Sequence, residues 1–214
     1  MSARHALRAA VGDFYRQSWR LFALNAALSI AAGLVALLAS YWRAGLLLLV
    51  LLGPLAAALM HCAVTVVRTE ELRFSNALTG LRLHWRRGLV LGAVAAAAVF
   101  LGGHGIVFYG RFHGLAVTLA FVALYLLFVV GLYLLFLLVV AVDEPRLGLR
   151  PAASRALELF ASRPGAALGL GGALALVNLV GIAAALMPFL TLTLAYSFLA
   201  AARFALPHTS DSPS

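Results

Sequence analysis

The sequence predicts an all-α fold, a polytopic transmembrane helix bundle of six spans with short amphipathic helices at the cytoplasmic surface. Hydrophobic residues make up 64% of the 214 residues and charged residues only 11%, whereas soluble domains carry about 25% charge. Apolar runs of about 20 residues or more recur along the chain, long enough to cross a hydrocarbon core about 30 Å thick. These runs are rich in Ala, Leu and Val without strand alternation, so they satisfy their backbone polar groups as helices.

We place these spans in a single transmembrane domain, residues 1–206, and expect residues 207–214 to form a disordered tail. The predicted spans are about 19–39, 45–67, 88–109, 115–142, 165–182 and 186–204. The last two come from dividing one apolar run of about 40 residues, because one crossing needs only about 20. Gly181 and Pro188 are the expected hinge, since Pro starts a helix but does not continue one. A five-span alternative keeps 165–189 as one helix.

The distribution of arginine predicts the orientation. The net charge is +9, and all sixteen basic residues are Arg. They cluster between the apolar runs, a pattern typical of membrane orientation and not of a nucleic-acid-binding face. With the N-terminus inside, fourteen Arg lie in cytoplasmic segments and only Arg43 and Arg111 lie outside. The predicted location is a bacterial cytoplasmic (inner) membrane, with both termini in the cytoplasm. The bacterial source is inferred from the absence of Lys, which is typical of GC-rich genomes.

Short amphipathic helices are expected to lie in the cytoplasmic interface. In residues 73–87 an apolar face follows helical spacing, and a similar stretch covers residues 153–162. A weaker stretch precedes the first span, around residues 11–18. Arginine side chains on such helices reach lipid phosphates while aromatic side chains enter the acyl boundary. The residues expected to contact the bilayer and its anionic headgroups are Arg73, Arg82, Arg86, Arg87 and Trp85.

Small residues mark the expected kink and packing positions. Gly53-Pro54 interrupts a span and frees a backbone carbonyl. The third and fifth spans begin with GxxxG, which allows two helix backbones to approach closely. The candidate positions are Gly53, Pro54, Gly88, Gly92, Gly165 and Gly169. The span at 115–142 is dominated by large apolar residues and is expected to face lipid.

Polar residues within the spans are few. No Asp, Glu or Arg lies in the middle of a predicted span, which argues against a proton-driven carrier. The remaining polar side chains suit either hydrogen bonds between helices or a substrate path. The residues of this candidate polar path are Asn25, Asn178, Thr191, Thr193, Tyr196 and Ser197.

We expect no catalytic residue, no metal site and no cofactor. The sequence holds no Walker A loop, G-x-S-x-G, H-E-x-x-H or dinucleotide fingerprint. His61 and Cys62 are adjacent, so on a helix their side chains point about 100° apart. His104 and His113 are interpreted as packing or interface residues.

Several short motifs together carry a family resemblance. They are Asn25, Gly53-Pro54 with small residues after it, Arg68 to Glu71 followed by Phe74, Trp85-Arg86-Arg87, and a C-terminal hairpin ending in a small-residue-rich helix and Arg203. With these motifs, over nearly its whole length, the chain resembles the YesL-like family of bacterial membrane proteins of uncharacterised function. It departs from the family at Leu55-Ala56-Ala57, where Thr often follows Gly-Pro-x. The resemblance implies an association with carbohydrate uptake systems.

Two functions follow as hypotheses. The first is an accessory or assembly component of a membrane complex, with a membrane-protein partner such as a sugar importer. The alternative is a small-molecule or lipid permease, suggested by the Gly-Pro kink and the polar stripe on the last span. A membrane-bound enzyme is a third and weaker hypothesis, because no catalytic motif supports it.

Overall fold

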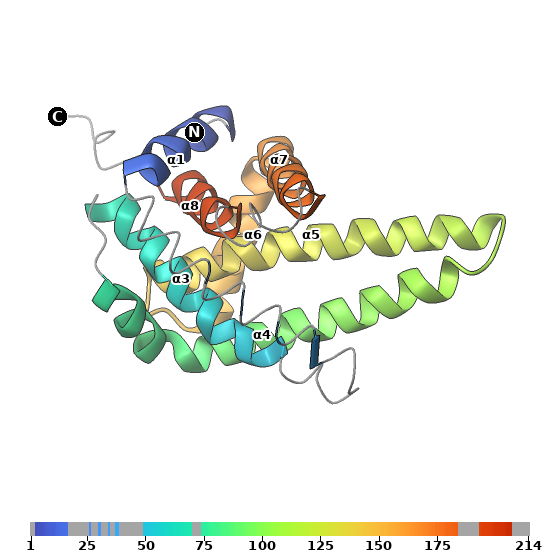
Figure 1. The fold of residues 1–214 in the computed structure, drawn as a ribbon, viewed down its shortest axis with the longest axis horizontal. Helices are drawn as coiled ribbons and strands as arrows, with labels where there is room; N and C mark the ends of the chain where they lie inside the picture. Colours follow the sequence, from blue (N-terminus) through green and yellow to red (C-terminus); the bar gives the residue numbers. More distant parts are fainter. Residues whose placement is uncertain are drawn as a thin grey trace.

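The computed structural model describes residues 3–16, 49–69, 74–183 and 193–206, together with Ala26, Ile30, Leu34, Leu37 and Leu38. These ranges are helical except for the turns that join or end the helices, and they contain no strand. Figure 1 shows the helices, coloured along the chain from blue at the N-terminus to red at the C-terminus. They are α1 (Ala3–Arg16), α3 (Leu49–Thr69), α4 (Phe74–Tyr109), α5 (Leu115–Asp143), α6 (Leu149–Ser162), α7 (Pro164–Ala183) and α8 (Leu194–Ala205).

Four of the described helices are long and apolar enough to cross a membrane, namely Val50–Thr69, Ser75–Tyr109, Leu115–Asp143 and Pro164–Gly181. The predicted helical membrane bundle is therefore confirmed, with four candidate spans in the part of the chain that the structure describes. Most of the predicted span 19–39 and the expected tail 207–214 lie outside the described residues. The predicted span 186–204 is represented by α8 alone, which has 12 residues.

α4 is one helix of 36 residues, about 54 Å long at 1.5 Å per residue. The prediction of a separate interfacial helix at 73–87 followed by a span at 88–109 was therefore wrong. Glycine costs a helix only about 1 kcal/mol relative to Ala, so Gly88 does not end it. α4 and α5 form a long hairpin, whose tight turn holds Gly114 at φ +73°, a conformation that favours glycine. Its far half projects beyond the other helices (Figure 1).

The hydrophobic core lies at the other end of this hairpin. It joins Ala57–Val66 of α3, the last two turns of α5 and nearly all of α8. Phe136 of α5 stacks on Phe204 of α8, with 5.6 Å between the ring centroids. The expectation that 115–142 faces lipid was thus wrong for its C-terminal part, because Phe136–Val142 are buried.

Two amphipathic helices flank this core. α1 buries Ala6 and Ala10 and packs against α8 and α7. Tyr196 of α8 donates a hydrogen bond to the carbonyl of Leu7 at 3.2 Å. α6 buries Ala152 and Ala156. The first and last described helices therefore lie side by side (Figure 1).

Candidate functional site

A charged cluster gathers where α3, α4, α5 and α6 meet. It comprises Arg68, Arg87, Asp143, Glu144 and Arg155. α5 ends here, because Pro145 lacks a backbone N–H and disfavours helical geometry at the residue before it. The C-cap residue Glu144 has φ −116° and ψ 77°, and its N–H bonds the carbonyl of Val140. The sequence Asp143-Glu144-Pro145 thus places two carboxylates at the helix end.

The first contact of the charged cluster joins α3 to α5. The guanidinium of Arg68 contacts both carboxylate oxygens of Asp143, through Nε–Oδ1 at 3.2 Å, Nη2–Oδ1 at 3.1 Å and Nη2–Oδ2 at 2.8 Å. Such bidentate pairs are stronger and more directional than single contacts. The Asp143 side chain is only 14% exposed, whereas that of Arg68 is 39% exposed, so water still screens this pair in part.

The second contact is made by Arg87 of α4. Its two terminal nitrogens donate to the carbonyls of Ala141, Glu144, Pro145 and Leu147, at 2.5–3.3 Å. The last carbonyls of a helix have no partner within the helix and carry partial negative charge. The guanidinium of Arg87 therefore supplies hydrogen-bond donors to the unpaired backbone carbonyls at the end of α5 and just after it. The prediction that Arg87 contacts lipid phosphates was wrong, because its donors are turned into the protein.

The third contact joins α6 to α5 through an ion pair between Arg155 and Glu144. Beside it lies a hollow of about 500 Å³. Its polar lining is Arg68, Asp143, Glu144, Arg155, Glu158 and Ser162, and its apolar lining is Val140, Leu159, Ala205 and Leu206. Its arginines and Asp143 and Glu144 are already paired with each other. The arrangement therefore fixes helix ends, and its described side chains form no nucleophile–base pair.

The other predicted interfacial residues lie on the exposed side of α4. Arg82, Trp85 and Arg86 are exposed, and the Arg86 guanidinium lies 5.3 Å from the centre of the Trp85 ring. Arg73 lies outside the described residues. The buried face of this segment carries Gly80, His84 and Gly88, whereas Leu78 and Trp85 are exposed.

Four of the six predicted packing positions meet where α3 crosses α4. A Cβ atom on Gly53 would lie 2.0 Å from the carbonyl oxygen of Gly88 and 2.8 Å from the Cα of Gly92. A Cβ on Gly88 would lie 2.6 Å from the Cα of Pro54. The two backbones therefore touch. In contrast, no atom lies within 4 Å of a Cβ built on Gly165 or Gly169.

Two packing glycines were missed. A Cβ on Gly80 would lie 2.8 Å from the Cβ of His61, and one on Gly171 would lie 2.6 Å from Leu132. Gly80 interrupts an otherwise polar helix face, and this was the only sequence signal. Gly171 stands beside Gly172 in the sequence, and nothing in the neighbouring residues indicated which of the two glycines packs against another helix.

The described members of the candidate polar path form hydrogen bonds both within and between helices. Asn178 of α7 donates to the hydroxyl of Ser197 of α8 at 2.8 Å and to the carbonyl of Leu174 at 2.7 Å. Ser197 in turn donates to the carbonyl of Thr193 at 2.7 Å. Asn25 and Thr191 lie outside the described part of the chain. These contacts favour the hydrogen-bonding interpretation over a substrate path.

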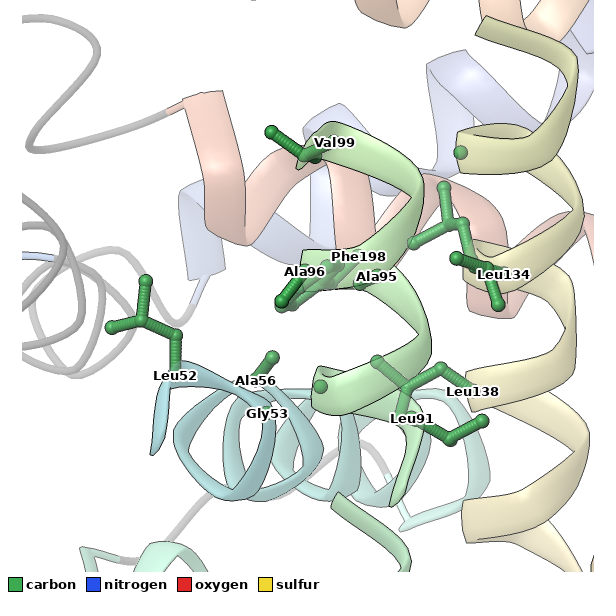
Figure 2. A pocket seen from close by; sticks show the side chains of 13 residues that line it. Leu52, Gly53, Ala56, Leu91, Ala95, Ala96, Val99, Leu134, Leu138 and Phe198 are labelled. Atoms are coloured by element: carbon green, nitrogen blue, oxygen red, sulfur yellow. The ribbon is translucent and has the colours of Figure 1, made fainter. Parts of the chain in front are cut away.

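A second hollow of about 320 Å³ lies beside the α3–α4 crossing (Figure 2). Its lining contains only apolar residues and glycine, among them Ala56, Leu91, Ala95, Leu134 and Phe198. Such a lining suits an acyl chain or another apolar group.

The fold and the charged cluster define a helical membrane protein whose helix ends are fixed by arginine. No family model, curated protein or solved structure matches the chain. The YesL-like resemblance therefore stays a prediction.

Proposed function

We propose that the chain is a non-catalytic accessory or assembly component of a membrane complex, with six spans and both termini in the cytoplasm of a bacterium. The observation that carries this proposal is the far half of the α4–α5 hairpin. In the most apolar stretch of α4, 6% of the residues are buried by the described structure, against 50% in α3. This helix therefore has a long apolar face for contacts outside the described bundle.

The exposed face of α4 suits a neighbouring helix. Ala93 and Ala97 lie on it one turn apart, beside Val94 and Leu101. Small residues one turn apart let another helix backbone approach closely, whereas contact with lipid alone needs no such spacing. The YesL-like resemblance adds the proposed partner, a membrane subunit of a sugar importer.

Affinity purification from native membranes tests the proposal with two matched variants. Ala97→Trp places a bulky ring on the proposed contact, and Leu176→Trp does the same on the exposed face of α7. We expect wild type and Leu176→Trp to retain one membrane subunit of a transport system at stoichiometric amounts, and Ala97→Trp to lose it. Repeated purification without such a partner, or retention by Ala97→Trp, contradicts the proposal.

The apolar hollow in Figure 2 favours a second candidate, a permease for lipids or other apolar molecules. Ala95→Phe would fill the hollow without touching the exposed face of α4. If transport of a fluorescent lipid between vesicles requires the chain and fails in Ala95→Phe, the permease is the better account. If neither protein moves lipid, this candidate is excluded.

A further inference from the structure

Two histidines from different helices face each other inside the bundle. The rings of His61 on α3 and His84 on α4 have centroids 5.3 Å apart and planes tilted by 46°. His84 is 1% exposed. Gly80, one turn before His84, leaves the space that His61 occupies, because a Cβ there would lie 2.8 Å from the Cβ of His61.

The ring of His84 is buried without hydrogen bonds. Neither of its nitrogens has a partner in the described structure. Leaving a buried polar group unpaired costs about 1–3 kcal/mol, and buried polar side chains in proteins nearly always have a partner. A second imidazole within reach indicates a ligand that both rings could bind.

The separation of the rings suits one shared metal ion. An ion bound at about 2.0 Å by a ring nitrogen lies about 3 Å from that ring's centroid, so two rings on one ion have centroids about 5–6 Å apart. The observed 5.3 Å corresponds to a bent N–metal–N arrangement, and a linear one needs the ring centroids to move about 1 Å further apart. The Cβ–Cγ torsion of histidine is soft, so either ring can turn a nitrogen toward the space between them.

The charge of the surroundings selects the ion. No group of three or more His, Cys, Asp or Glu occurs in the described part of the chain, so two neutral imidazoles would bear the charge of the ion alone. The cost of moving an ion into an apolar interior rises with the square of its charge. The cation of Arg87, three residues after His84, disfavours a second positive charge further. A monovalent ion that accepts two nitrogen ligands is therefore favoured.

We propose that His61 and His84 form a two-imidazole site for a closed-shell monovalent cation, Cu(I) or its analogue Ag(I). The bound ion would link α3 to α4 one to two turns from their glycine crossing. Imidazole is a common copper ligand. The adjacent Cys62 lies on a different side of α3 from His61, as their spacing of one residue requires.

Binding of Ag(I) to the detergent-purified full chain without an affinity tag tests this site. Unlike Cu(I), silver(I) is not oxidised by air and does not disproportionate, so the samples are kept in the dark and free of reductant and chloride. We expect one ion per chain in wild type, in Cys62→Ser and in His104→Leu, the last altering an exposed histidine of the same helix. His84→Leu and His61→Leu should each weaken binding by more than the roughly 10–100-fold that loss of an outer-shell partner costs.

X-ray absorption of the silver-loaded protein should show nitrogen and no sulfur in the first shell. Loss of binding in Cys62→Ser, or binding unchanged in His61→Leu or His84→Leu, would overturn the proposal, as would no stoichiometric binding to wild type. His61 is only partly buried, so His61→Leu decides the matter if His84→Leu does not fold.

Discussion

At the scale of single residues, the arginines divide into two kinds that share one sequence context. Arg86 and Arg87 are neighbours, yet Arg86 lies over an exposed ring while Arg87 bonds four carbonyls. Sequence reasoning assigned both to lipid phosphates, because both lie on the polar part of an amphipathic pattern. Only the position of the end of α5, far along the chain, distinguishes them.

Replacement of Arg87 by Lys should destabilise the protein. Lysine keeps the charge but not the planar fork that reaches several carbonyls at once, and hydrogen bonds to charged groups contribute about 1.5–3 kcal/mol each. We expect the midpoint of thermal unfolding in detergent to fall by about 2–4 °C for each kcal/mol lost. Arg86→Lys is the matched control and should change the midpoint little. Equal effects of the two substitutions would show that Arg87 has no capping role.

At the scale of elements, the sequence predicted which segments form helices, but it predicted only in part which helices pack together. The apolar runs gave α5 within a residue of its observed ends, Leu115–Asp143. Gly88 and Gly92 were predicted packing positions, because small residues at four-residue spacing permit close backbones, but their contact with Gly53 was not predicted. Gly165 and Gly169 have the same spacing but no close neighbour. A local motif permits a crossing, whereas its use depends on which helix the fold brings near.

Gly53→Ala should therefore weaken the α3–α4 crossing. The added methyl would meet the backbone of Gly88, which cannot move aside as a flexible side chain would. Overpacking of this kind costs about 1–3 kcal/mol. Gly103→Ala is the control, because no atom lies within 4 Å of a Cβ there, and it should be neutral or stabilising by up to about 1 kcal/mol. Thermal unfolding of both variants measures the difference, and a Gly53→Ala protein as stable as Gly103→Ala would refute the crossing.

The exposed face of the first part of α4 gives another element-scale prediction. Leu78 and Trp85 lie on one edge of this face, and Leu83 lies on the opposite edge; all three are exposed. If the Leu78 edge lies in the lipid interface, a spin label at 78 should be accessible to oxygen and shielded from water. A label at 83 should be more accessible to water. If the label at 78 were as accessible to water as the label at 83, this edge would lie in the cytoplasm, where a soluble partner could bind it.

At the scale of the whole molecule, the Arg count predicted which residues share a side of the membrane. Arg68, Arg87, Glu144 and Arg155 come from two separate predicted cytoplasmic segments, and the structure brings them into one cluster. Arg111, predicted outside, lies in the turn between α4 and α5. The deep burial of α8 was not predicted, because its Ala-rich sequence resembles that of α4, which is largely exposed. Whether an Ala-rich helix is buried depends on the helices that pack against it and not on its composition.

From the arginine distribution, we expect the charged cluster to face the cytoplasm and the α4–α5 turn to face outward. Cys62 is the only cysteine and is buried, so Cys62→Ala gives a clean background for single cysteines at the exposed positions Arg111 and Arg146. A membrane-impermeant maleimide added to intact cells should label Arg111→Cys and leave Arg146→Cys unlabelled until the cells are lysed. Labelling of Arg146→Cys in intact cells, with Arg111→Cys protected, would contradict the account.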